Sequence, residues 1–155
     1  MIWNQRIVYC FVVAIIAIAT IADYFSIDRS GTRTIPPIAE ETLAQAADRD
    51  FDFKRNLEAA YQGNEASLDA LFRFAKQTDA AGALGYGVAV VELVETIGEE
   101  LPASVAKRLA PDEKQCLAGA LAAGVAYGLE RDPDEAPQRY PVLYRALNQN
   151  ISAGK

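Results

Sequence analysis

Hydrophobic residues first form one long run near the start of the chain. From Ile7 to Ala22 there is no charged residue and almost no polarity. Four residues suited to a membrane–water interface flank this run: Trp3, Arg6, Tyr24 and Phe25. A helix from Trp3 to Phe25 would be about 33 Å long, close to the roughly 30 Å of a bilayer's hydrocarbon core. The pattern predicts a single transmembrane helix within residues 1–25.

A cleaved signal sequence is the main alternative for the same residues. Small residues precede possible cleavage sites after Ala19 and after Ala22. The apolar run is long for a signal sequence, which favours an uncleaved anchor over both this alternative and a buried soluble helix. Arg6 precedes the run, whereas Asp23 and Asp28 follow it, which favours an N-terminus inside the cell. We therefore expect a single-pass protein of the inner (cytoplasmic) membrane with its acidic domain on the periplasmic side.

Residues 26–37 predict a linker, because they are rich in turn formers and end in two prolines. Apolar residues at intervals of three and four begin at Ile38, and the pattern predicts a helical domain over residues 38–155. Two amphipathic helices are expected early in it, at Asp50–Gln62 and Glu65–Lys76. The phenylalanines of this part, including Phe51 and Phe74, are interpreted as core residues rather than as the lining of a ligand pocket.

The centre of the domain contains an internal repeat. Ala81–Ala89 returns 37 residues later as Ala118–Ala126 and is identical at seven of nine positions. Such a recurrence indicates a duplicated supersecondary unit. We expect long inner helices at Ala80–Ile97 and at about Glu113–Glu130, and a closing helix at about Pro137–Asn150.

Glycines are unusually frequent in the two predicted inner helices. A glycine inside a helix costs up to about 1 kcal/mol relative to alanine, so close approach of another helix should offset the cost. The candidate helix-packing residues are Gly82, Gly85, Gly87, Gly119, Gly124 and Gly128. Gly87 and Gly124 hold equivalent positions in the repeat and should hold equivalent positions in the core. Membrane insertion of the two helices is disfavoured, because their apolar stretches are short and bounded by charge.

A short basic and apolar sequence recurs around the inner helices, at Phe72–Ala75, Lys107–Ala110 and Tyr144–Leu147. Together with the Ala-Gly-Ala-Leu stretches, this alternation over residues 65–150 resembles HEAT-type helical repeats. The resemblance implies stacked antiparallel helix pairs. Because the chain has room for only about two and a half pairs, a compact bundle of hairpins fits equally well. In either case the fold class is all-α.

Composition excludes several classes of function. The net charge of −6 and the lack of a basic face argue against nucleic-acid binding. With no histidine, the chain lacks the commonest proton shuttle and metal ligand, and no disulfide is expected between Cys10 and Cys116. Three glutamates share one predicted helical face, Glu92, Glu95 and Glu99, and are interpreted as a solvated face rather than a cation site. No catalytic, cofactor-binding or metal-binding residue is predicted.

The sequence therefore favours a non-enzymatic, membrane-anchored helical interaction protein. Its expected partners are membrane lipid and another protein, and its expected role is that of an accessory subunit or adaptor in a membrane complex. The alternative is a periplasmic immunity or inhibitor protein whose acidic surface binds a toxin or an enzyme.

Overall fold

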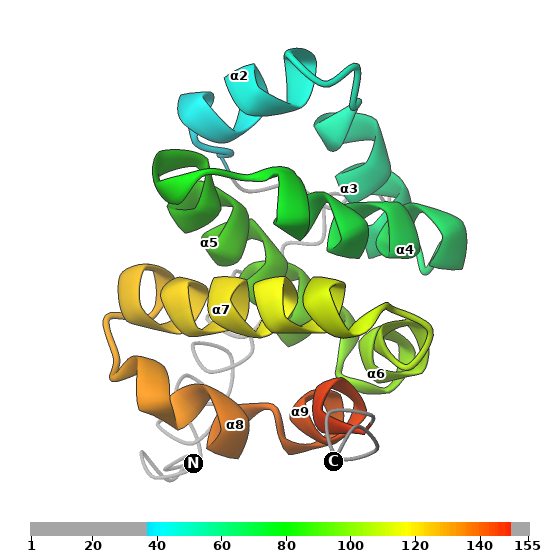
Figure 1. Cartoon of the computed structure of the whole chain (residues 1–155), viewed down its shortest axis with the longest axis vertical. Helices are drawn as coiled ribbons and strands as arrows, with labels where there is room; N and C mark the ends of the chain where they lie inside the picture. The colour runs from blue at the N-terminus through cyan, green and yellow to red at the C-terminus, as the bar shows by residue number, and fades with distance from the viewer. Residues whose placement is uncertain (1–36, 150–155) are drawn as a thin grey trace, which may run out of the picture. The chain divides into compact units, whose positions relative to one another are not determined.

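The computed structural model describes residues 37–149 and is all-helical over that range (Figure 1). The all-α prediction is thus confirmed for this part of the chain. The chain divides into two units, Met1–Thr34 and Ile35–Lys155, and the described residues all belong to the second. The predicted membrane span with its four interface residues, Cys10 and nearly all of the linker lie outside the described residues.

Three short helices begin the second unit. They are α2 (Glu40–Ala47), α3 (Phe53–Tyr61) and α4 (Glu65–Phe74), and a 3-10 turn, η1 (Ala75–Gln77), extends α4. The helix predicted from Asp50 begins three residues later, because Asp50 has φ +53° and Asp52 caps the helix through a 3.1 Å hydrogen bond from Arg55 N. Asn64 caps α4 in the same way, accepting from Ser67 N at 3.0 Å.

Two long helices form the centre of the unit. They are α5 (Ala80–Ile97) and α7 (Pro111–Gly128), which cross each other and are joined through α6 (Glu100–Ala106) (Figure 1). The bounds of α5 are those predicted. Helix α7 begins two residues before the predicted start, because Pro111 suits the first helical position and the Glu113 carboxylate accepts a 2.8 Å hydrogen bond from Ala110 N.

The closing segment differs from the single helix that the sequence predicts. It consists of a 3-10 turn, η2 (Pro133–Glu135), and two short helices, α8 (Ala136–Arg139) and α9 (Pro141–Asn148). The break falls at Tyr140, whose φ and ψ of −121° and 61° are not helical. Proline disfavours helical geometry in the residue before it but is itself well suited to start a helix, so Pro141 ends α8 and begins α9.

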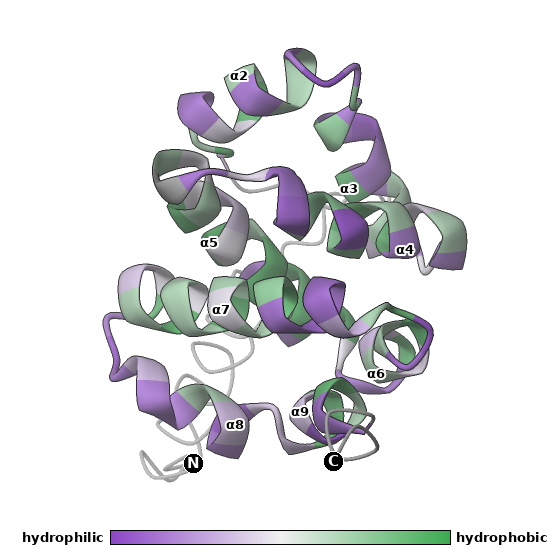
Figure 2. Ribbon diagram, in the orientation of Figure 1, coloured by the Kyte–Doolittle hydropathy of each residue, from purple (hydrophilic) through white to green (hydrophobic). Residues whose placement is uncertain are grey.

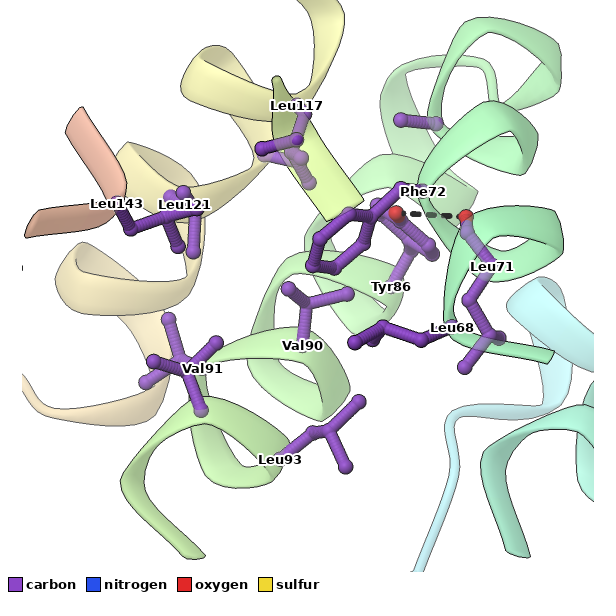
Figure 3. Packing of buried hydrophobic residues seen from close by; sticks show 14 of the residues in the cluster. Leu68, Leu71, Phe72, Tyr86, Val90, Val91, Leu93, Leu117, Leu121 and Leu143 are labelled. Atoms are coloured by element: carbon purple, nitrogen blue, oxygen red, sulfur yellow. Dashed lines mark hydrogen bonds between the residues drawn. The ribbon is translucent and has the colours of Figure 1, made fainter. Parts of the chain in front are cut away.

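A continuous apolar core lies between these helices (Figure 3). Phe72, Tyr86 and Leu121 are fully buried in it, and the Tyr86 hydroxyl donates a 2.9 Å hydrogen bond to the Leu71 carbonyl oxygen. Burial raises the pKa of Tyr86. Its ring meets those of Phe53 and Phe74 edge to face. The phenylalanines of the first helices therefore pack in the core, as the sequence predicts.

Over residues 37–149, no helix combines the length and the hydropathy that crossing a membrane requires.

Candidate functional site

The two repeated stretches meet where α5 crosses α7. A Cβ atom on Gly87 would lie only 2.9 Å from the backbone nitrogen of Gly124, and a Cβ on Gly124 would lie 2.6 Å from the carbonyl carbon of Gly87. Backbone atoms cannot rotate out of the way as side chains can, so the crossing requires glycine on both helices. The structure thus brings together the two glycines that are equivalent in the repeat.

Helix α2 covers a second glycine-containing face of α5. A Cβ on Gly85 would meet the side chains of Ala39 and Thr42, and one on Gly82 would meet that of Gln45. The buried Thr42 hydroxyl donates a 3.1 Å hydrogen bond to the Gly82 carbonyl oxygen.

Gln45 of α2 also forms hydrogen bonds with Asp79, the residue just before α5. Its side-chain oxygen accepts from Asp79 N at 3.0 Å, and its amide nitrogen donates to the Asp79 carboxylate. The same carboxylate caps α5 by accepting from Ala81 N and Gly82 N at 3.2 Å each. The bond from Gly82 N, followed by that from Gln45, lowers the pKa of Asp79.

The remaining two candidate glycines lie in more open surroundings. A Cβ on Gly128 would lie 3.3 Å from the Val88 methyl groups, which is a tight contact but one with a side chain. Nothing lies within 4 Å of a Cβ on Gly119, which is exposed. The sequence predicts a packing role for Gly119, but no helix packs against it among the described residues. The sequence around Gly119 nevertheless matches that around Gly82.

The two copies of the repeat bury opposite faces. Leu84 of α5 is 37% exposed, whereas its equivalent Leu121 in α7 is fully buried. Figure 3 shows Leu143 of α9 projecting toward Leu121. In turn, Gly82 is buried beneath α2, whereas its equivalent Gly119 has no cover among the described residues.

This arrangement leaves an uncharged surface on the two central helices. We call it the open face and define it by Leu84, Val88, Gly119, Ala123, Tyr127 and Gly128. Leu84 lies one turn before Val88 on α5, and Val88 contacts Gly128 of α7. On α7, Gly119, Ala123 and Tyr127 follow one another at intervals of four residues. Tyr127 is 65% exposed. Beyond its first turns α7 carries little polar colour (Figure 2), because no residue from Gln115 to Leu129 is charged.

The three glutamates on α5 and just after it are exposed or half-buried, and two of them also bind the closing helices. Glu99 accepts hydrogen bonds at 2.9 Å from Val142 N and Leu143 N, so it caps the start of α9. Glu95 accepts from Arg139 Nε at 2.8 Å and from the Tyr140 hydroxyl at 2.6 Å. These two carboxylates attach the closing helices to the end of α5.

The pKa shifts follow from these surroundings. Desolvation alone would raise the pKa of Glu95, but the hydrogen bonds from Tyr140 and Arg139 outweigh it, so the pKa lies below its ordinary value. Burial, followed by the bond to Glu95, raises the pKa of Tyr140 to about 12. Glu92 has no such partner among residues 37–149, and desolvation raises its pKa. Among the described residues, no group of three acidic or cysteine side chains is placed to hold a metal ion.

Lys114 is not among the candidate residues that the sequence predicts. It is only 1% exposed, and its ammonium nitrogen has no hydrogen-bond partner within the described part of the chain. Its position could have been found from helical spacing, because it precedes Leu117, Leu121 and Val125 on the buried face of α7. The neighbouring Cys116 is a free, half-buried thiol.

Comparison with protein-family models, with curated proteins and with solved structures finds no match to this chain.

Proposed function

We propose that this chain is a non-enzymatic, membrane-anchored interaction protein, in which duplicated helix hairpins present the open face to a partner protein. An accessory subunit or adaptor of a membrane complex is the role that fits best. The anchor is proposed from the apolar run at residues 7–22, which has the length and flanking residues of a single span. Of the candidate small residues, Gly82, Gly85, Gly87, Gly124 and Gly128 are proposed to set the spacing of the helices.

The observation that carries the proposal is the exposure of Leu84 and Tyr127 within uncharged stretches of the two helices, residues 80–91 of α5 and 115–128 of α7. Tyrosine is enriched at protein–protein interfaces, because its ring contributes apolar area and its hydroxyl can hydrogen-bond. Small residues beside it, such as Gly119 and Ala123, allow another backbone to come close. The overall charge of −6 favours solubility of the rest of the surface.

The proposal is tested by purifying the tagged full-length chain in a mild detergent and identifying its partners by mass spectrometry. Tyr127→Glu and Leu84→Glu should each deplete the partner, because a carboxylate on the open face would be buried at the interface. Ala66→Glu, at an exposed position in the first turn of α4, is the matched control and should retain it. Equal recovery with all three variants would exclude the open face as the binding surface.

The membrane part of the proposal has its own test. Membranes are washed with concentrated salt and with carbonate, and the protein should leave them only with detergent. Release by salt alone would exclude the anchor. Recovery of a single basic enzyme, whose activity falls when the chain binds, would favour the inhibitor role over that of a subunit.

A further inference from the structure

A half-open groove of about 290 Å³ lies along the junction of α6 and α9. The two helices lie side by side (Figure 1), and Glu99, just before α6, caps the start of α9. Each helix lines the groove with residues spaced at i, i+3, i+4 and i+7, beginning at Glu100 on α6 and at Val142 on α9. Seven residues of helix rise about 10.5 Å, so the groove is about two helical turns long.

The groove has an apolar base and polar sides. Ala103 and Ala146 are buried at 3% and 1% exposure, and their small side chains allow a backbone to approach. Val142, by contrast, is 37% exposed at one end and offers an aliphatic contact. Ser104 and Gln149 add neutral hydrogen-bonding groups. Walls with helical spacing fit the ridges of another helix. Extended peptides bind instead to free strand edges or to aromatic-lined grooves, and the residues that line this groove provide neither.

Two unpaired cations line this groove in an otherwise acidic protein. Lys107 and Arg145 are exposed and form no ion pair within residues 37–149. Five other cations of that range have carboxylate partners, Arg73, Lys76, Arg108, Arg131 and Arg139, whereas Arg49, Lys54, Arg55 and Lys114 have none. At one end of the groove, where both helices begin, lie Glu100 of α6 and Val142 of α9. Lys107 lies toward the other end, just after the last turn of α6. The charge along the groove therefore changes from negative to positive.

We propose that the groove between α6 and α9 binds an acidic helical segment of a partner protein. Small or aliphatic residues of that helix lie over Ala103 and Ala146, and two carboxylates one turn apart pair with Lys107 and Arg145. The charge gradient sets the direction of the helix, because its carboxylates are repelled from the Glu100 end. The groove shares no residue with the open face, so this inference goes beyond the proposed function and does not depend on it.

The test uses the full-length chain in a mild nonionic detergent and a fluorescent alanine-based helical peptide. The peptide carries one leucine and two glutamates four residues apart, and its binding is followed by fluorescence anisotropy at low salt. We expect saturable binding that Lys107→Glu/Arg145→Glu weakens about tenfold or more. The matched control is Lys54→Glu/Arg55→Glu, which reverses two exposed cations of α3 and changes the net charge equally. It should leave the binding unchanged.

A charge-swapped peptide sharpens the result. The same peptide with lysines in place of the glutamates should bind Lys107→Glu/Arg145→Glu more tightly than the original chain. The proposal is overturned if both double variants weaken binding equally, or if a peptide with glutamines binds as tightly as the acidic one. It is also overturned if the peptide does not bind while phosphatidylglycerol vesicles bind the original chain but not the groove variant, because the groove would then recognise lipid phosphate. Thermal unfolding monitored by circular dichroism checks that both double variants are folded.

Discussion

Helices α5 and α7 contain nearly the same nine-residue stretch and have the same length, yet each is covered on a different side. Their shared face is the crossing, where Gly87 meets Gly124. Beyond it, α2 covers Gly82 and Gly85 on α5, whereas α9 covers the Leu121 side of α7. Each copy therefore exposes the face that the other copy buries. A duplicated sequence sets the contact between its copies but leaves the outer faces to whichever elements precede and follow them.

The largest expected effect comes from the paired leucines. Leu121→Ala should lower the free energy of unfolding by about 2 to 5 kcal/mol, because it leaves a cavity in the core. Leu84→Ala removes the equivalent side chain from the open face and should cost less than about 1 kcal/mol. Urea unfolding of both variants measures the difference. Similar losses at the two positions would contradict the asymmetry between the helices.

Alanine substitutions at two glycines of α7 should have opposite effects on stability. Gly124→Ala should destabilise the protein by about 1 to 3 kcal/mol, since the new Cβ would clash with the backbone of Gly87. Gly119→Ala meets open space and should stabilise α7 by about 0.5 to 1 kcal/mol, because alanine favours the helix. Thermal unfolding measures both. Stabilisation by Gly124→Ala would show that the helices are not in close contact at the crossing.

The buried face of α7 contains an amine that has no counterpart on α5. Lys114→Met keeps the length of the side chain but removes a buried amine that lacks a hydrogen-bond partner among the described residues. We expect the free energy of unfolding to rise by about 1 kcal/mol. Gln77, which is equivalent in the repeat, is exposed, and Gln77→Met should change stability by less than about 0.5 kcal/mol. Destabilisation by Lys114→Met would indicate that the amine does have a partner in the folded protein.

The smallest effect concerns the contact between the end of α5 and the closing helices. Because the folded-state pKa of Glu95 is lowered, its carboxylate stabilises the fold above the ordinary pKa of 4.5, and this contribution is lost as pH falls through the lowered value. At pH 7, Glu95→Gln should cost about 0.5 kcal/mol, a value that allows for solvent screening of a partly exposed pair. The free energies of unfolding of the original and variant chains, measured in urea, should converge once the pH falls below the lowered pKa of Glu95. In an Arg139→Gln background the difference at pH 7 should be smaller.

The apolar spacing and glycine content of the described residues predict much of the fold. Periodicity predicts most of the helices, and the bounds of α5 agree with the structure. Errors occurred where backbone geometry overrode the apolar pattern. Asp50, with a positive φ, delays α3, and Pro141 divides the closing segment. The residues that cause these breaks can be read from the sequence. The spacing of apolar residues, however, continues across both positions and predicts an unbroken helix there.

The sequence by itself determined the elements and the residues that allow close approach, because helix periodicity and the lack of a side chain on glycine are local properties. Only the tertiary structure decided which face of each helix is covered. Gly82 and Gly119 lie within the same four residues, Ala-Gly-Ala-Leu, yet one is buried under α2 and the other is exposed. The pairing of Glu95 and Glu99 with the closing helices also joins residues more than 40 positions apart. Burial depends on what packs from elsewhere in the chain, and no local pattern contains that information.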